Sequence, residues 1–441
     1  MRNKLLVLFV ISFLLIFTTS IFAGEITINF WHAMSGKRIK AVEAVVNGFN
    51  KTHPGIKVVP LFTGKYAETL TKAIAAYRAG NPPDIVQVYE VGYQTMVDSG
   101  AIVPVYKILK GYNFGDIVGP IKRYYSYKGN LVSMPFNSST AMLYFNKDAF
   151  VKAGLDPNNP PTTFDDVYKA GLAIVKSGAA QAGITFGWPA WIFEQMHAYH
   201  DQLYANNDNG RGELKATELY INKPFGVKVL AEWMKWHHDG VFLYGGREYS
   251  ANQAFLSGQA AMLIQSTSSL ASIESAASFK VGTTFLPKMP GYPTGNSVIG
   301  GATIWVMKGL SDEKYKAIAE FLKYIGQPDV TIMWHNMTGY FPITNSAVKK
   351  LLDTGSFAKH PNSLTAFLQI LTGNVKDPAA IGVRLGGFVQ IRDVVDSAIE
   401  KAMQYKGTDY EKEAKKILDD AEKKANKILK DYVRMYGAKN E

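Results

Sequence analysis

The sequence contains no cysteine. No disulfide can support its fold, and no lipid can be attached through a cysteine after a leader, so stability must come from a hydrophobic core. The 441 residues are 47% hydrophobic and 19% charged, which is typical of a globular protein with two or three folding units. This composition excludes a largely disordered chain.

Beyond residue 23 the sequence also lacks an apolar stretch long enough to span a bilayer. The N-terminus differs, because Arg2 and Lys4 precede an apolar run over residues 5–17 and a small residue, Ala23. This pattern predicts a cleavable secretory signal over residues 1–23 and a mature protein in the periplasm. An uncleaved membrane anchor is the alternative, since a spanning helix needs about 20 apolar residues.

The motifs of common catalytic and nucleotide-binding sites are missing, namely G-x-S-x-G, H-E-x-x-H, G-x-G-x-x-G and the phosphate-binding P-loop. The eight histidines are scattered. The pairs His197 with His200 and His237 with His238 lack a neighbouring cluster of carboxylates or cysteines of the kind that metal sites show. We interpret them as structural residues, and we expect no enzyme activity, no metal and no cofactor.

Positive charge is in excess but is not concentrated in one segment. The formal net charge is +11, and loss of a leader that contains Arg2 and Lys4 would leave +9. Because the basic residues are spread along an exported chain without a nucleic-acid-binding motif, we expect no nucleic-acid partner. An excess of this kind favours the approach of a small anionic solute.

Strand and helix patterns alternate along the chain. Residues 25–31 alternate apolar and polar side chains, which predicts a strand, and residues 39–50 show the three- and four-residue spacing of a helix. Such alternation with short turns predicts βαβ units and a mostly parallel sheet. The other expected elements are strands over 56–62, 84–89, 131–134, 141–145, 260–265, 281–285 and 302–306, and helices over 70–77, 224–238, 312–324 and 409–441 and from Thr163 onward.

Residues 134–150 contain a polar run between two apolar segments. Pro135 and the run over residues 137–140 are unsuited to a core strand, because proline lacks a ladder donor and small polar residues favour turns. We interpret the run as a linker between two lobes, with its hydroxyls facing the space between them. An ordinary surface loop is the alternative.

Aromatic and polar residues at expected strand ends and turns indicate a ligand site. Tyr66 lies at a strand-to-helix turn, and Tyr89 and Glu90 end a strand at the sheet edge where open α/β sheets bind ligands. Trp188 and Trp191 belong to one proline-containing segment that we interpret as a loop. Their position predicts two indoles outside the core.

Together these stretches form an ordered set of motifs that covers nearly the whole mature chain. The motifs are Phe30-Trp31-His32, Gly64-Lys65-Tyr66, Gln87-Val88-Tyr89-Glu90-Val91-Gly92, Pro135-Phe136-Asn137-Ser138-Ser139-Thr140, Tyr144-Phe145-Asn146-Lys147-Asp148-Ala149-Phe150, Gly187-Trp188 with Trp191, Ile299-Gly300-Gly301-Ala302, Thr338-Gly339-Tyr340-Phe341-Pro342-Ile343-Thr344, and Arg384-Leu385-Gly386 with Gln390-Ile391-Arg392. In these motifs the chain resembles the periplasmic glycerol-3-phosphate-binding proteins of ABC uptake systems, which belong to the sugar-type, maltose-binding-protein-like solute-binding proteins.

The resemblance implies a two-lobed α/β fold. Each lobe would be a mixed, mostly parallel sheet flanked by helices, with the ligand in the cleft between the lobes. The N-lobe would comprise residues 24–137 and 296–341, and the C-lobe residues 138–295 and 342–441. The protein would be a monomer that delivers its ligand to membrane permease subunits served by a cytoplasmic ATPase.

The resemblance also implies a set of ligand-binding residues. In the family the acidic residue and the first tyrosine hold the glycerol hydroxyls, and the remaining residues surround the phosphate. Carried over to this chain, the contacts fall on Tyr66, Glu90, Ser139, Ser266, Gly301, Tyr340 and Arg392. These types suit the ligand, because arginine can bind phosphate through two parallel hydrogen bonds and hydroxyls supply neutral donors.

Three segments depart from the family pattern and leave the exact ligand open. They are Ser266-Thr267-Ser268-Ser269, Gly387-Phe388-Val389 and Pro189-Ala190. Glycerol 3-phosphate is one candidate. A glycerophosphodiester such as glycerophosphocholine is another, with Trp188, Trp191 and Tyr89 as an additional wall for its substituent. A binder of di- or oligosaccharides and, more remotely, a secreted phosphodiester hydrolase are the alternative functions.

Overall fold

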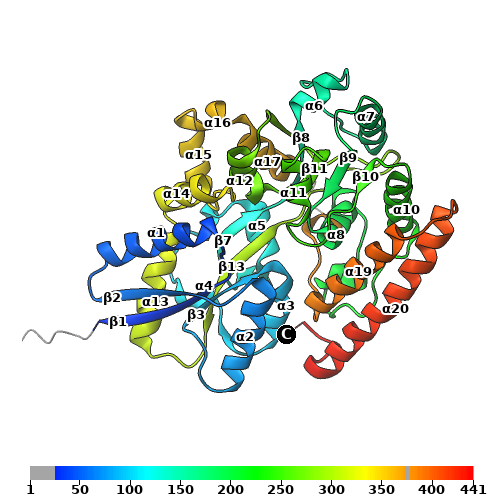
Figure 1. Ribbon diagram of the computed structural model, residues 1–441. Coiled ribbons are helices and arrows are strands. Elements are labelled where there is room, and N and C mark those ends of the chain that lie inside the picture. Colours follow the sequence, from blue (N-terminus) through cyan, green and yellow to red (C-terminus); the bar gives the residue numbers. More distant parts are fainter. Residues whose placement is uncertain (1–24, 374–376, 441) are drawn as a thin grey trace, which may run out of the picture.

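The computed structural model describes residues 25–373 and 377–440 of the protein (Figure 1). The predicted signal over residues 1–23 lies outside the described residues. Over the described ranges, no helix combines the length and the apolar character that a membrane-spanning segment requires.

The first sheet is six-stranded, with the order β2-β1-β3-β13-β4 and with β7 paired to β13. Strands β1, β2 and β3 run parallel to one another, whereas β13 runs antiparallel to β3, β4 and β7. The strands are β1 (Ile26–His32), β2 (Ile56–Phe62), β3 (Ile85–Tyr89), β4 (Ile102–Val103), β7 (Met134–Ser139) and β13 (Gly300–Met307). The first sheet and the helices packed on it form what we call the N-lobe.

The second sheet is five-stranded, with the order β10-β9-β11-β8-β12. Strands β10, β9 and β11 run parallel, and β8 runs antiparallel to β11 and β12. The strands are β8 (Ala141–Asn146), β9 (Ala182–Phe186), β10 (Phe242–Leu243), β11 (Ala260–Ser266) and β12 (Val281–Thr284), and a separate hairpin pairs β5 (Ser126–Tyr127) with β6 (Asn130–Leu131). We call this sheet and its helices the C-lobe. Both sheets are mixed, and in each a single strand, β13 in the first and β8 in the second, runs opposite to all the others, which confirms the prediction of mixed, mostly parallel sheets.

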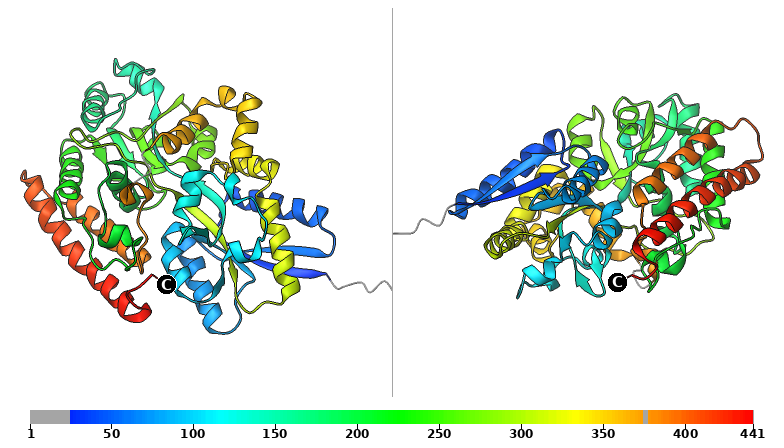
Figure 2. Two further views of the ribbon diagram at one scale, coloured as in Figure 1. Left: turned by 180° about the vertical axis from the view of Figure 1, so that it is seen from behind. Right: turned by 90° about the horizontal axis from the view of Figure 1, so that it is seen from below.

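Helices cover both sheets (Figures 1 and 2). Those of the N-lobe are α1 (Lys37–Thr52), α2 (Tyr66–Arg78), α3 (Tyr93–Asp98), α4 (Val105–Ile108), α5 (Gly119–Tyr124), α13 (Asp312–Ile325) and α14 (Pro328–Thr338). Those of the C-lobe are α6 (Lys147–Lys152), α7 (Phe164–Lys176), α8 (Pro189–Tyr199), α9 (Asn206–Gly210), α10 (Pro224–His238), α11 (Ala251–Leu256), α12 (Leu270–Ala276), α15 (Asn345–Asp353), α16 (Ser356–Lys359), α17 (Pro361–Thr372), α18 (Pro378–Ile381), α19 (Phe388–Met403) and α20 (Tyr410–Tyr436).

The polar run after Met134 is a strand, which corrects the interpretation of this run as a linker that could not be a strand. Residues Met134–Ser139 form β7, and all six are buried. Proline is tolerated because β7 pairs in the sheet with β13 alone and the register shifts by a bulge beside Ala302 and Thr303. The predicted strand over residues 131–134 is correspondingly interrupted, since β6 ends at Leu131.

The chain passes between the sheets directly after β7. Thr140 separates β7 in the first sheet from β8 in the second. Two other segments lie against this crossing, because Thr140 Oγ1 donates a hydrogen bond to the carbonyl of Val298 over 3.0 Å and the Phe341 N–H donates to the carbonyl of Ser138 over 2.7 Å. The lobe boundaries given above, which place the crossings near these residues, remain a prediction.

The C-terminal helix α20 also links the lobes. It packs along α10 and α19 on the outside of the C-lobe, and its end reaches α3 of the N-lobe (Figure 1). There the Tyr432 hydroxyl donates to Asp98 Oδ2 over 2.8 Å. The helix predicted over 409–441 is confirmed, and its apolar residues, such as Ile417 and Leu429, form one buried stripe.

Candidate functional site

A narrow cavity lies between the two lobes. The cavity is lined by Tyr66, Tyr89, Glu90, Ser139, Trp188, Trp191, Tyr249, Ser266, Ser268, Gly300, Gly301, Tyr340 and Arg392. All seven predicted ligand-binding residues and all three residues of the predicted additional wall therefore meet around one space. Their role in binding remains a prediction.

Strand ends bring these residues together. Glu90 directly follows β3, Ser139 ends β7, Ser266 ends β11 and Gly301 lies at the start of β13. These strands belong to two different sheets whose ends face the same space. This is the arrangement expected of ligand sites in open α/β sheets, and it explains why residues from distant parts of the sequence converge.

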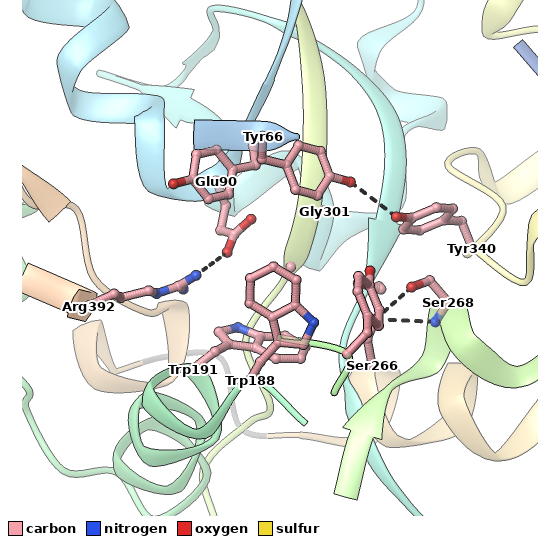
Figure 3. Close-up of a pocket in the computed structure, with 13 residues that line it drawn as sticks. Tyr66, Glu90, Trp188, Trp191, Ser266, Ser268, Gly301, Tyr340 and Arg392 are labelled. Carbon is pink, nitrogen blue, oxygen red and sulfur yellow. Dashed lines mark hydrogen bonds and ion pairs between the residues drawn. The ribbon is translucent and has the colours of Figure 1, made fainter. Parts of the chain in front are cut away.

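Arg392 lies at one end of the cavity beside Glu90 (Figure 3), and a second carboxylate, that of Glu194, contacts it from outside the cavity lining. Its Nη1 donates to Glu90 Oε1 over 2.8 Å and its Nη2 donates to Glu194 Oε2 over 2.7 Å. The side chain of Arg392 is 11% exposed, and those of Glu90 and Glu194 are 6% and 2% exposed. Glu90 belongs to the N-lobe and the other two residues to the C-lobe, so this buried cluster joins the lobes.

The charges in this cluster are already balanced. Burial works to lower the pKa of Arg392, but the two carboxylates outweigh it and raise the pKa, so the guanidinium stays charged. Burial raises the pKa values of Glu90 and Glu194, and Arg392 opposes that rise. Because two carboxylates face one guanidinium, Arg392 brings no uncompensated positive charge to the cavity. This argues against the phosphate-binding role that the resemblance implies for it.

Hydroxyl groups gather at the opposite end of the cavity (Figure 3). Asn137 Nδ2 donates to the Tyr66 hydroxyl over 2.9 Å, and that hydroxyl lies 3.1 Å from the hydroxyl of Tyr340. Ser266 Oγ lies 2.9 Å from Ser268 Oγ and also accepts from the Ser268 N–H over 3.3 Å. Burial raises the pKa of Tyr66 well above its usual value, so its hydroxyl remains a donor at neutral pH.

Aromatic rings form the walls between these two ends. Tyr66 and Tyr89 are stacked with their ring centroids 5.1 Å apart, and Trp188 meets Tyr249 edge to face at 5.2 Å. Trp191 is 5% exposed, and its indole N–H has no hydrogen-bond partner among the described residues. The expectation of two indoles in one loop is wrong for Trp191, because Pro189 occupies the first turn of α8 and starts a helix there.

Gly301 allows the strands to approach closely beside the cavity. Its φ of 103° lies in a region that side-chain-bearing residues avoid, and a Cβ atom there would lie 2.0 Å from the Asn137 carbonyl oxygen. Its neighbour Gly300 leaves room for Trp191, whose ring would be 2.7 Å from a Cβ at that position. Two adjacent glycines are therefore required by the packing of β7, β13 and α8.

Sequence reasoning missed several residues of the site. Ser268 lies in the serine-rich segment that departs from the family pattern, and the glycine-containing turn before Tyr249 is the sequence signal for that residue. Glu194 gave no signal, because it lies within a buried helical segment and contacts the cavity through Arg392. A charged residue in such a segment indicates a buried ion pair once the arginine is known.

The histidines that were considered as ligands have structural contacts. His197 and His200 are buried, and His200 accepts from the Met289 N–H through Nε2 over 2.7 Å while Nδ1 contacts the Met196 carbonyl over 2.7 Å. Their interpretation as structural residues fits these contacts. In the described part of the chain, no group of three or more histidine, cysteine, aspartate or glutamate side chains has a metal-binding arrangement.

Two α/β lobes around a cavity of charged, hydroxyl and aromatic side chains define a binding protein that holds a small ligand between its lobes. The model of the family of bacterial extracellular solute-binding proteins matches residues 44–366. The sn-glycerol-3-phosphate-binding periplasmic protein UgpB of Yersinia pestis bv. Antiqua is 39% identical over 390 residues, which cover 86% of this chain and 88% of that protein.

Solved structures share the fold. The crystal structure of UgpB from Mycobacterium tuberculosis in complex with glycerophosphocholine has a TM-score of 0.78 and 22% identity, and the match covers 93% of this chain and 100% of that one. The cyclic alpha-maltosyl-1,6-maltose binding protein from Arthrobacter globiformis has a TM-score of 0.74 and 22% identity, with 92% and 100% covered. The chain belongs to the bacterial extracellular solute-binding proteins, which confirms the resemblance seen in its motifs.

Proposed function

We propose that this protein is the periplasmic solute-binding component of an ABC importer and that it binds glycerol 3-phosphate and glycerophosphodiesters. It delivers the intact ligand as a monomer to membrane permease subunits, whose transport is powered by a cytoplasmic ATPase. Its own role is binding without chemical change. The observation that carries this proposal is the division of one interlobe cavity into a carboxylate–arginine end and a hydroxyl end.

The two ends suit the two parts of a phosphorylated polyol. Glu90 can accept from paired glycerol hydroxyls, and the Arg392 guanidinium that it binds can donate to them. Tyr340, Ser266 and Ser139 supply neutral donors for the phosphate at the other end. The carboxylates of Glu90 and Glu194 repel a phosphate placed beside them, so the cavity would bind the ligand in one orientation.

The aromatic wall supports the inclusion of diesters. Trp188 is half-buried, and its ring lines the cavity between the two ends (Figure 3). A substituent on the phosphate would extend along this wall, where a choline head group gains cation–π attraction. The Mycobacterium tuberculosis relative holds glycerophosphocholine, but at 22% identity it supports the fold alone, so the diester proposal depends on the wall.

Ligand binding would favour the arrangement in which the lobes are in contact. Besides the Arg392 cluster, Lys65 of the N-lobe donates to Glu248 of the C-lobe over 2.6 Å. A ligand that touches both lobes shifts the population toward this form by the difference between its affinities for the two forms. The permease would then recognise the pair of lobes as one surface.

A sugar is the alternative ligand, because aromatic rings around a cavity also stack on pyranoses and the fold is shared with a maltosyl-maltose-binding protein. The test is a thermal-unfolding panel of the mature protein with glycerol 3-phosphate, glycerophosphocholine, maltose and trehalose. A ligand at 100 times its Kd stabilises the folded state by about 2.7 kcal/mol. We expect stabilisation by the two phosphate esters. Stabilisation by the sugars alone would assign the sugar function, and release of phosphate or choline during incubation would assign a hydrolase.

A further inference from the structure

Arg38 lies beside the hydroxyl end of the cavity, outside the set of residues that line it. It is the second residue of α1 in the N-lobe and is half-buried. Its guanidinium carbon lies 5.3 Å from the ring centroid of Tyr340 and 5.4 Å from that of Tyr249, both of which line the cavity. The guanidinium is therefore packed against the outer side of the two tyrosines.

The hydrogen bonds of Arg38 cross to the C-lobe. Its Nη1 donates to the Tyr249 hydroxyl over 3.3 Å, and its Nη2 donates to the carbonyl of Ser268 over 3.0 Å and to Ser268 Oγ over 3.4 Å. Ser268 Oγ in turn lies 2.9 Å from Ser266 Oγ. Arg38 is thus linked to the cavity-lining hydroxyls through direct contacts rather than through space alone.

These contacts orient the hydroxyls as donors toward the cavity. A hydroxyl that accepts a hydrogen bond from Arg38 can still donate its own hydrogen to another acceptor. The Tyr249 hydroxyl accepts such a bond and can therefore donate into the cavity. Ser266 accepts from the Ser268 N–H, so its hydrogen is also free to point elsewhere. A set of hydroxyl donors that face one space binds an anion, and a cation behind them strengthens each donor.

Arg38 and Arg392 differ in their compensating charges. Arg392 contacts two carboxylates, whereas Arg38 forms no ion pair with any described residue. The positive charge of Arg38 is therefore available to the hydroxyl end of the cavity. In a partly desolvated site this charge acts over several ångströms on a ligand that it does not touch.

We infer that Arg38 is a positioning residue that makes the hydroxyl end of the cavity selective for phosphate and favours a dianionic monoester over a monoanionic diester. The inference rests on the proposed function, since it names the residue that sets ligand charge. Arg38 acts through Tyr249, Ser268 and Tyr340, which contact the phosphate. It is a specificity determinant that the family motifs in this chain do not include.

The experiment is isothermal titration of wild type, Arg38→Gln and Arg38→Lys with glycerol 3-phosphate and with glycerophosphocholine at pH 7.5. Coulomb energy is proportional to ligand charge. Arg38→Gln should therefore lower the affinity for the monoester by about twice as many orders of magnitude as the affinity for the diester. We expect a loss on the order of 100-fold for the monoester against about 10-fold for the diester. Arg38→Lys keeps the charge and should restore most of the monoester preference.

Lys65→Ala is the matched control. The Lys65–Glu248 contact also joins the lobes, but it involves no hydroxyl group that lines the cavity. If Arg38 served merely to hold the lobes together, Arg38→Gln and Lys65→Ala would weaken both esters by equal factors. An unchanged monoester-to-diester ratio in Arg38→Gln would overturn the inference. A wild-type protein that binds neither ester would refute the proposed function itself. Thermal unfolding of each ligand-free variant establishes that the compared proteins are folded.

Discussion

Replacing Arg392 by alanine would leave Glu90 and Glu194 facing each other without the guanidinium that now separates them. In the structure both carboxylates are almost fully buried, and each accepts a hydrogen bond from one nitrogen of Arg392 over 2.7–2.8 Å. Their pKa values are already raised by burial, and Arg392 is the charge that opposes the rise. We therefore expect the Arg392→Ala variant to take up protons near neutral pH and to lose both stability and affinity.

The magnitude follows from the removal of one partner of a buried ion pair, which typically costs about 3–5 kcal/mol. This is a large part of the about 5–15 kcal/mol by which folded domains are stable. Affinity should fall as well, because the donors to the ligand's hydroxyls are lost and a carboxylate that stays ionised repels an anionic ligand. At about 1.4 kcal/mol per tenfold, the loss is a few hundredfold to a few thousandfold in Kd.

Urea denaturation measures the stability change and isothermal titration calorimetry with glycerol 3-phosphate measures the affinity change. The matched control is the Arg392→Ala, Glu194→Gln double variant, in which one of the two stranded carboxylates is neutral. It should recover part of the lost unfolding free energy, because Glu194 contacts Arg392 and does not line the cavity. An Arg392→Ala protein with wild-type stability and affinity would refute the reasoning and remove Arg392 from the site.

Three further predictions concern the wall, the glycine turn and a buried histidine. Trp188→Ala should weaken glycerophosphocholine more than glycerol 3-phosphate by about 2-fold to 30-fold, the equivalent of about 0.5–2 kcal/mol of cation–π attraction; equal losses for both esters in calorimetry would exclude a separate diester wall. Gly301→Ala should cost about 1–3 kcal/mol more in urea denaturation than Gly309→Ala, because both have positive φ but a Cβ at Gly309 meets no atom within 4 Å; equal costs would show that the close approach to Asn137 is not limiting. Burial lowers the pKa of His200 to about 4, so the unfolded chain binds more protons than the folded one between pH 6.5 and 4, and the stability contributed by this residue falls as the pH falls through that window; a nuclear magnetic resonance titration in which His200 protonates near pH 6.5 would contradict this.

Much of the fold could be predicted from local patterns. The expected helix over 224–238 has those bounds in the structure, and the helix expected from Thr163 onward begins at Phe164 with Thr163 as its N-cap. The failures occur where tertiary contacts override local preference. Pro135 lies in a buried strand because β7 pairs with one strand and the pairing contains a bulge. The local sequence predicts neither feature.

The site could be predicted as a set of residues but not as a set of contacts. Motif resemblance placed ten residues around one cavity, whereas the pairing of Arg392 with two glutamates depends on a helix that comes from a distant part of the chain. The sequence gives no sign of Arg38, because it belongs to none of the motifs and joins the site through Ser268, about 230 residues away. Long-range pairs of this kind follow from topology, and periodicity carries no information about them.

The most direct test of the central claim is the crystal structure of the mature protein with glycerol 3-phosphate. The account predicts an intact ester in the interlobe cavity, with its hydroxyls on Glu90 and its phosphate within hydrogen-bond distance of Tyr340 and Ser266. A cavity that stays empty at saturating ligand, or a phosphate bound against Arg392 with Glu90 displaced, would contradict it.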